Sequence, residues 1–262
     1  MSVELVIVGG GNMGAALLGG MIASGTAPER LAVVETLAAR RDHLAQQFPG
    51  VAVSASVTPC PAAVIAVKPP DVPEAVSAAV RAGARRVLSI AAGVSVATIQ
   101  SAAGDGVAVV RAMPNTPALV GQGASAIAGG ESATDDDLTW AESVLGAVGT
   151  VARVDETDLD AVTALSGSGP AYLFLVAEAL IDAGESAGLD RTLAESLTTQ
   201  LFVGSAALLA DRGNPTTLRE MVTSPGGTTA AGLHVLEARA VRAAIADAVH
   251  AAATRSAELG AR

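Results

Sequence analysis

The chain has 262 residues, half of them hydrophobic, which is enough to bury one large core or two smaller ones. Its formal charge of −10 argues against a nucleic-acid partner, because neutralising phosphates needs a basic surface. The single cysteine, Cys60, excludes an internal disulfide and a thiolate metal cluster, and we expect no metal site. No apolar run reaches the roughly 18 residues of a membrane span, and no basic leader precedes the first strand-like run, so we expect a cytoplasmic protein without a membrane partner.

Residues 1–153 alternate short β-branched runs with longer segments rich in alanine and leucine. Strands separated by helices in this way are typical of successive βαβ units, which build a parallel sheet covered on both faces. We therefore predict an α/β fold with a doubly wound, Rossmann-type sheet over 1–153. The predicted strands are Val3–Val8, Leu31–Val34, Val51–Val53, Val64–Val67, Val87–Ile90 and Val107–Arg111.

A glycine-rich loop follows the first strand directly and leads into a helical segment that starts near Ala15. In the pattern G-x-G-x-x-G, one glycine makes a tight turn, one lets the backbone approach a pyrophosphate, and one lets helix and strand pack closely. Backbone N–H groups at the helix N-terminus then bind the anion. The residues expected to contact a dinucleotide are Gly9, Gly11, Asn12, Met13 and Gly14.

Two signals at the end of the second strand disagree about which dinucleotide binds. Glu35 stands where an acidic residue commonly accepts hydrogen bonds from the adenosine ribose, which favours NADH. Arg40 and Arg41 follow within two helical turns and could pair with a 2′-phosphate, which favours NADPH. Alternatively, Glu35 caps the next helix and both arginines lie solvated on its surface, an interpretation that fits Arg41 at least as well. The sequence leaves the choice between NADPH and NADH open.

Lys68, the only lysine, stands with Pro69 and Pro70 at the end of the apolar run Val64–Val67. Open α/β sheets bind ligands at the carboxyl ends of their strands, so the ammonium could meet the ribose or pyrophosphate of a cofactor. The alternative is a lysine whose stem covers apolar surface while its charge stays in water.

Met113, Pro114 and Asn115 follow another predicted strand, and Pro114 and Pro117 restrict the backbone there. The Asn115 amide offers both a donor and an acceptor. It suits a cofactor carboxamide and a buried loop anchor equally well.

After Asp155 the β-rich runs stop, and apolar residues recur at helical spacing, as in Leu173, Val176 and Leu180. We predict that 154–262 form an all-helical domain. Segments such as Ala206–Ala210 and Ala243–Ala253 carry more apolar surface than a single bundle needs, which predicts an intertwined homodimer, with further assembly left open. The alternative is an alanine-rich bundle with close helix packing.

Within this half, Ser168 stands between two glycines, as in a nucleophile elbow, but no strand leads into it and we reject a serine hydrolase. Pro170 suits a first helical turn, so we predict that a helix starts here and brings two chain segments close together.

The stretch Ser224–Thr229 precedes a helical run that contains Leu233 and Leu236. Its glycines leave backbone N–H groups free at a helix N-terminus, and its hydroxyl groups add donors without charge, which is suited to binding a carboxylate. The alternative is an ordinary helix cap with a glycine turn. The candidate ligand residues are Ser224, Gly226, Gly227, Thr228 and Thr229.

Taken together, in this order and spacing, these stretches resemble the pyrroline-5-carboxylate reductase family along essentially the whole chain. The motifs that carry the resemblance are the glycine loop, Ala66–Pro69, Arg111–Pro117, Ser166–Tyr172 and Ser224–Thr229. The resemblance implies reduction of a cyclic imine to proline with NADPH or NADH. It also implies that Lys68 and Pro69 lie beside the cofactor, that Met113–Asn115 line the nicotinamide side, and that Ser224 and Gly227 hold the substrate carboxylate. Thr229 is then the catalytic residue, hydrogen-bonded to the ring nitrogen.

Two other functions remain for comparison. A β-hydroxyacid dehydrogenase shares the two-domain plan but uses a lysine in its helical half, and this chain has none there. A non-catalytic redox sensor would leave Ser224–Thr229 without a role. We further expect that the cofactor domain of one subunit faces the substrate loop of its partner.

Overall fold

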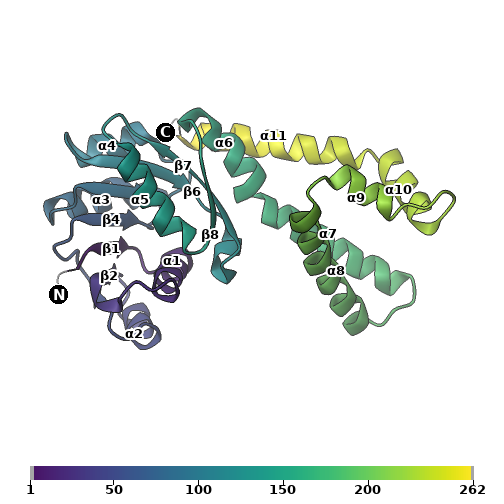
Figure 1. Ribbon diagram of the computed structural model, residues 1–262, viewed down its shortest axis with the longest axis horizontal. Helices are drawn as coiled ribbons and strands as arrows, with labels where there is room; N and C mark the ends of the chain where they lie inside the picture. The colour runs from purple at the N-terminus through teal and green to yellow at the C-terminus, as the bar shows by residue number, and fades with distance from the viewer. Residues whose placement is uncertain (1–2, 261–262) are drawn as a thin grey trace. The chain divides into compact units, whose positions relative to one another are not determined.

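The computed structural model describes residues 3–260 and contains one eight-stranded sheet in the order β3-β2-β1-β4-β5-β6-β7-β8 (Figure 1). The strands are β1 (Leu5–Val8), β2 (Leu31–Val34), β3 (Ala52–Ser54), β4 (Ala62–Ile65), β5 (Arg86–Ser89), β6 (Ala108–Met113), β7 (Gly123–Gly129) and β8 (Gly149–Arg153). The order reverses at β1, where the chain turns from one side of the sheet to the other. Every predicted strand is present.

The sheet is parallel from β3 to β6, as predicted, but β7 runs antiparallel to β6 and parallel to β8. The sequence analysis did not predict β7 or β8. The run Gly123–Gly129 consists of glycine, alanine and serine around one isoleucine, so it lacks the β-branched residues that mark a strand. Only a short 3₁₀ turn, Thr116–Val120, joins β6 to β7, which is too little chain for a parallel crossover and forces the reversal.

Helices cover both faces of the sheet because successive strand residues point to opposite sides. Leu5 and Ile7 of β1 belong to one buried cluster, whereas Val6 and Val8 belong to the other. The first cluster is completed by α1 (Asn12–Ala23), α2 (Ala38–Gln47) and α5 (Asp135–Gly146), and the second by α3 (Val72–Arg81) and α4 (Val96–Ala103). This is the doubly wound arrangement that the sequence predicts.

The chain divides into two compact units, one containing the residues up to Pro170 together with the segment from His250, and one formed by Ala171–Val249. The last strand ends at Arg153, the predicted domain boundary, but the first unit continues through α6 (Leu159–Val162) and a π-helical turn (Thr163–Gly167). The end of α11 (Val241–Gly260) also belongs to it, since Ser256 Oγ donates to Asp160 Oδ1 at 2.6 Å. The first compact unit therefore extends beyond the boundary that the end of the last strand predicts.

The second unit is helical, as predicted, and contains α7 (Gly169–Ser186) beyond its first turn, α8 (Arg191–Arg212), α9 (Pro215–Met221), α10 (Thr228–Ala238) and the start of α11. Among its described residues only Ala194 and Thr198 are buried. The segments Glu156–Ser186 and Arg191–Arg212 are long and apolar enough to meet the length and composition criteria for a membrane span, which the sequence analysis had excluded. Most apolar side chains of α7 and α8 are exposed within a single chain, so the described residues of this unit do not bury a core by themselves.

Candidate active site

The glycine loop lies at the carboxyl edge of the sheet, between the ends of β2 and β4. Gly9 N donates to Val34 O at 2.9 Å, and Ala66 N donates to Val8 O at 2.8 Å. Strand order reverses at this point, and the crevice beyond such a reversal is where open α/β sheets bind nucleotides.

Glycine occurs at each of these positions of the loop for a different structural reason. Gly9 has φ +113°, and a Cβ there would lie 2.5 Å from the Ala66 carbonyl oxygen. A Cβ on Gly14 would lie 2.1 Å from the Gly9 carbonyl oxygen, so only glycine lets α1 pack this closely. A Cβ on Gly11 would meet no described atom within 4 Å, which leaves open space in front of the backbone at the start of α1. This is the division of roles that dinucleotide binding requires.

The structure gives Glu35 and the two arginines local partners. The Glu35 carboxylate accepts from Leu37 N at 2.9 Å, but the N-cap of α2 is Leu37 and no side chain among the described residues caps it, so the predicted cap by Glu35 is absent. Arg41 donates to the carbonyl oxygens of Glu35 and Thr36, and therefore braces the turn. Arg40 Nε donates to Gly10 O at 2.8 Å, so its guanidinium is held against the glycine loop. Arg40 is thus the better placed of the two arginines for a phosphate at this edge.

Lys68 follows β4 and is exposed, immediately before the short 3₁₀ turn Pro69–Asp71. Lys68 follows β4 and the glycine loop follows β1. Because β4 and β1 are adjacent and parallel, both lie at the same edge of the sheet. An exposed cation at this edge can complement a phosphate without any cost of burial.

Asn115 is a loop anchor in this structure. Its Nδ2 donates to Ser166 O at 3.2 Å and to Ser166 Oγ at 3.1 Å, and its Oδ1 accepts from Ala124 N at 2.9 Å. Of the two alternatives that the sequence left open, these contacts support the anchor. Pro114 is buried beside it, and Met113 is half-buried, with its Cε 2.4 Å from where a Cβ on Gly167 would lie.

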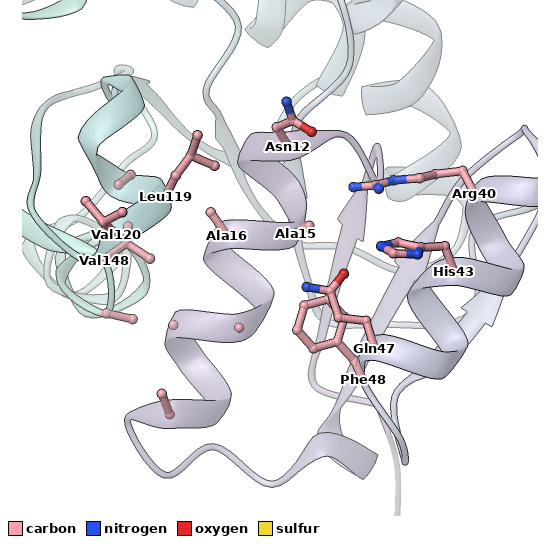
Figure 2. Close-up of a pocket in the computed structure, with 16 residues that line it drawn as sticks. Asn12, Ala15, Ala16, Arg40, His43, Gln47, Phe48, Leu119, Val120 and Val148 are labelled. Carbon is pink, nitrogen blue, oxygen red and sulfur yellow. The ribbon is translucent and has the colours of Figure 1, made fainter. Parts of the chain in front are cut away.

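A pocket of about 680 Å³ runs along the outer face of α1 (Figure 2). Asn12 lies at its upper end, Arg40, His43 and Gln47 line one side, and Leu119 and Val120 line the other. It includes Asn12 and Arg40 of the predicted cofactor residues but extends down the helix, away from the strand ends. The other predicted cofactor residues lie at or just after the ends of β1, β2, β4 and β6, at the carboxyl edge of the sheet.

The buried Arg111 forms an ion pair with the half-buried Glu156, and neither residue was predicted from the sequence to pair. Arg111 Nη1 donates to Glu156 Oε1 at 3.0 Å, and the same oxygen accepts from Val96 N at 2.6 Å, at the start of α4. The pair joins β6, α4 and the segment after β8 beside the Met113 loop. The sequence feature that could have pointed to this pair is an arginine within an otherwise apolar predicted strand.

The loop Ser224–Gly227 lies in the second unit, where Gly227 N donates to Ser224 O at 3.0 Å. Gly226 has φ +70°, a left-handed conformation that suits glycine. The helix α10 begins at Thr228 with Gly227 as its N-cap, and among the described residues no side chain caps it. Ser224, Thr228 and Thr229 are exposed. The loop therefore offers free backbone N–H groups and hydroxyls, which is the arrangement predicted for a carboxylate.

A doubly wound sheet with this glycine loop, followed by a helical unit, defines a nicotinamide-dependent oxidoreductase of the Rossmann type. Residues 4–93 match the family model described as NADP oxidoreductase, coenzyme F420-dependent, and residues 156–259 match the model described as pyrroline-5-carboxylate reductase dimerisation. The chain belongs to the pyrroline-5-carboxylate reductase family.

Relatives of that name match along the full length. The chain is 46% identical to the Synechocystis sp. enzyme, with 99% of each sequence covered, and 41% identical to that of Mycobacterium tuberculosis, with 98% of this chain and 96% of the relative covered. Among solved structures, a pyrroline-5-carboxylate reductase from Coxiella burnetii gives a TM-score of 0.91 at 35% identity, with 98% of each chain covered. The Plasmodium falciparum enzyme, solved with NADP bound, gives 0.86 at 29% identity, also with 98% of each chain covered.

Proposed function

We propose that this chain reduces 1-pyrroline-5-carboxylate to L-proline with NADPH or NADH, the last step of proline biosynthesis. The full-length similarity to proteins named pyrroline-5-carboxylate reductase carries the proposal. The glycine loop and the uncapped start of α10 supply the two binding functions that such a reaction needs, one for a dinucleotide and one for a carboxylate.

For the cofactor, the proposal assigns the pyrophosphate to Gly9, Gly11, Asn12, Met13 and Gly14. The open space in front of Gly11 fits a phosphate against the backbone. Glu35 and Arg40 lie toward the adenosine ribose, Lys68 and Pro69 beside the cofactor, and Met113 and Pro114 on the nicotinamide side. Asn115 supports this side through its loop contacts.

For the substrate, the proposal assigns the carboxylate to Ser224, Gly226, Gly227 and Thr228, through backbone N–H groups and hydroxyls. When bound, the cofactor supplies a hydride to the imine carbon. Thr229 Oγ1 accepts a hydrogen bond from the protonated ring nitrogen, which orients the ring and favours the electrophilic iminium form. Because that carbon is already electrophilic, alignment of the two reactants supplies much of the catalysis.

The proposal includes a homodimer in the cytoplasm. The dimerisation model covers 156–259, the part of the chain whose apolar helices are exposed. Pairing of these faces explains why two helices that are apolar enough for a membrane span belong to a water-soluble enzyme.

The test is loss of reduced-nicotinamide absorbance with pyrroline-5-carboxylate, run in parallel with NADPH and NADH. We expect turnover with both and, because Arg40 is held at the loop, higher kcat/KM with NADPH. Thr229→Val keeps the side-chain shape but removes the hydroxyl, and should lower kcat about 10- to 100-fold, the low end for a group acting on proton position. A folded dimer that binds cofactor without turning over this imine would contradict the substrate assignment.

A further inference from the structure

Where the first unit leads into α7, one carbonyl loses the donor that a regular helix would give it. Pro170 has no N–H to donate to Ser166 O, the carbonyl four residues earlier, which is the partner it would have in a regular helix. The helix is correspondingly irregular there, with a π-helical turn over Thr163–Gly167 and a bend at Ser168 before α7 begins. A half-buried carbonyl in this position needs a donor from elsewhere.

Asn115 supplies that donor. Its Nδ2 lies 3.2 Å from Ser166 O and 3.1 Å from Ser166 Oγ, although the two residues are 51 positions apart. Its Oδ1 accepts a hydrogen bond at 2.9 Å from the backbone N of Ala124, the second residue of β7. Ala124 N can only donate a hydrogen bond and Ser166 O can only accept one. The side-chain amide of Asn115 therefore satisfies both partners only with its oxygen toward Ala124 and its nitrogen toward Ser166.

A second contact holds the same two segments together. Met113 Cε lies only 2.4 Å from where a Cβ on Gly167 would be, so the Met113 side chain packs against the π-helical turn. Both contacts lie within the first unit, directly before its boundary at Pro170. The loop expected beside the nicotinamide is therefore joined to the last residues before α7.

We propose that Asn115 is a positioning residue for imine reduction, acting through Ser166 rather than on the cofactor. By donating to Ser166 O, it holds the segment that leads into α7 against the loop Met113–Asn115, which the proposed function places on the nicotinamide side. The inference rests on the proposed function for its kinetic consequence. The hydrogen bond itself can be tested without any substrate.

Two substitutions separate positioning from cofactor binding. Asn115→Asp keeps an oxygen for Ala124 N but removes the hydrogens donated to Ser166. Pro170→Ala returns an N–H that can pair with Ser166 O within the helix, which makes the Asn115 donor dispensable. The wild type, both single variants and the double variant are compared by hydrogen exchange over residues 163–174, cofactor titration and steady-state kinetics.

In Asn115→Asp we expect exchange over residues 163–174 to accelerate about tenfold, since the part-buried hydrogen bonds donated to Ser166 are lost. The cofactor dissociation constant should stay within about twofold, while kcat/KM for the imine falls about 10- to 100-fold from misalignment. In the double variant most of both losses should be recovered. Should Asn115→Asp not fold, Asn115→Ala is measured with and without Pro170→Ala, and rescue of folding by the restored N–H is the expected result.

Unchanged exchange in Asn115→Asp would overturn the inference, and so would faster exchange with unchanged kcat/KM. Weaker cofactor binding that Pro170→Ala does not restore would show instead that Asn115 contacts the cofactor. A wild-type enzyme inactive on pyrroline-5-carboxylate would overturn the proposed function, whereas the exchange comparison would still decide whether Asn115 holds the start of α7.

Discussion

At the scale of single residues, the glycine loop separates what the fold needs from what a ligand needs. Gly9 and Gly14 are required by the folded chain, because a Cβ on either would lie within 2.5 Å of a backbone oxygen. Gly11 has ordinary extended geometry, φ −66° and ψ −173°, and open space around it, so the folded chain alone would accept a side chain there. Its glycine is explained by close approach of a phosphate to the backbone.

This difference predicts opposite behaviour in two matched variants. Gly11→Ala should change the free energy of unfolding by no more than about 1 kcal/mol, the usual difference at an N-cap, yet weaken cofactor binding at least about tenfold. Gly14→Ala should lower the free energy of unfolding by about 2 kcal/mol, because the added methyl overpacks the contact between loop and helix. Urea denaturation without cofactor and fluorescence titration with NADPH measure the two effects. Normal cofactor affinity in Gly11→Ala would contradict the assignment of the loop.

At the scale of secondary-structure elements, α5 shows how local bonding defines a helix start. Thr134 Oγ1 accepts from Asp137 N, while the Asp137 carboxylate accepts from Thr134 N at 3.0 Å, a reciprocal capping box. Arg86 pairs with the same carboxylate at 3.3 Å and lies over the Trp140 ring. Burial alone would raise the pKa of Asp137, but the hydrogen bonds from Thr134 and the charge of Arg86 bring it below its ordinary value.

A carboxylate whose pKa is lower in the folded state than in the unfolded state raises the free energy of unfolding at neutral pH. This contribution is lost as the pH falls through the pKa of the folded state. Asp137→Asn should therefore lower the free energy of unfolding by about 1 kcal/mol at pH 7, with the difference shrinking below about pH 4. Asp136→Asn, at the exposed neighbouring position, is the control and should change little. Urea denaturation between pH 3 and pH 7 makes the comparison. A loss in Asp137→Asn that stays constant over this range would refute the role of its charge.

At the scale of the whole molecule, the second unit is incomplete as a single chain. Large apolar side chains along its helices are exposed, among them Phe174 at 64%, Leu175 at 65% and Val203 at 59%. Burying such side chains in a subunit interface stabilises each by about 1.5–3 kcal/mol, which a lone chain forgoes. We expect a dimer in which the substrate loop of one subunit meets the cofactor of the other, and subunit mixing tests this.

Lys68→Ala and Thr229→Ala subunits, each nearly inactive alone, are co-expressed with different tags and purified as heterodimers. If each site combines two subunits, one site receives both intact residues, and activity should recover to about half that of the wild-type dimer. If both residues serve one site within a single chain, every site carries a defect and the activity stays at background. The second result would contradict the shared site while leaving the dimer intact.

The sequence alone predicted what depends on local patterns. Short β-branched runs marked every strand from β1 to β6, and the glycine loop marked the nucleotide edge, because those signals lie within a few consecutive residues. The helical character of the second half and the start of α7 at Gly169 followed in the same way.

The tertiary structure alone decided what depends on residues far apart in the chain. Asn115 bonds to Ser166, 51 positions away, and the Arg111–Glu156 pair joins residues 45 positions apart. The reversal at β7 and the return of α11 to the first unit are equally non-local. Local sequence patterns do not predict such partners, because the hydrogen-bond partner of a side chain depends on how distant elements pack together.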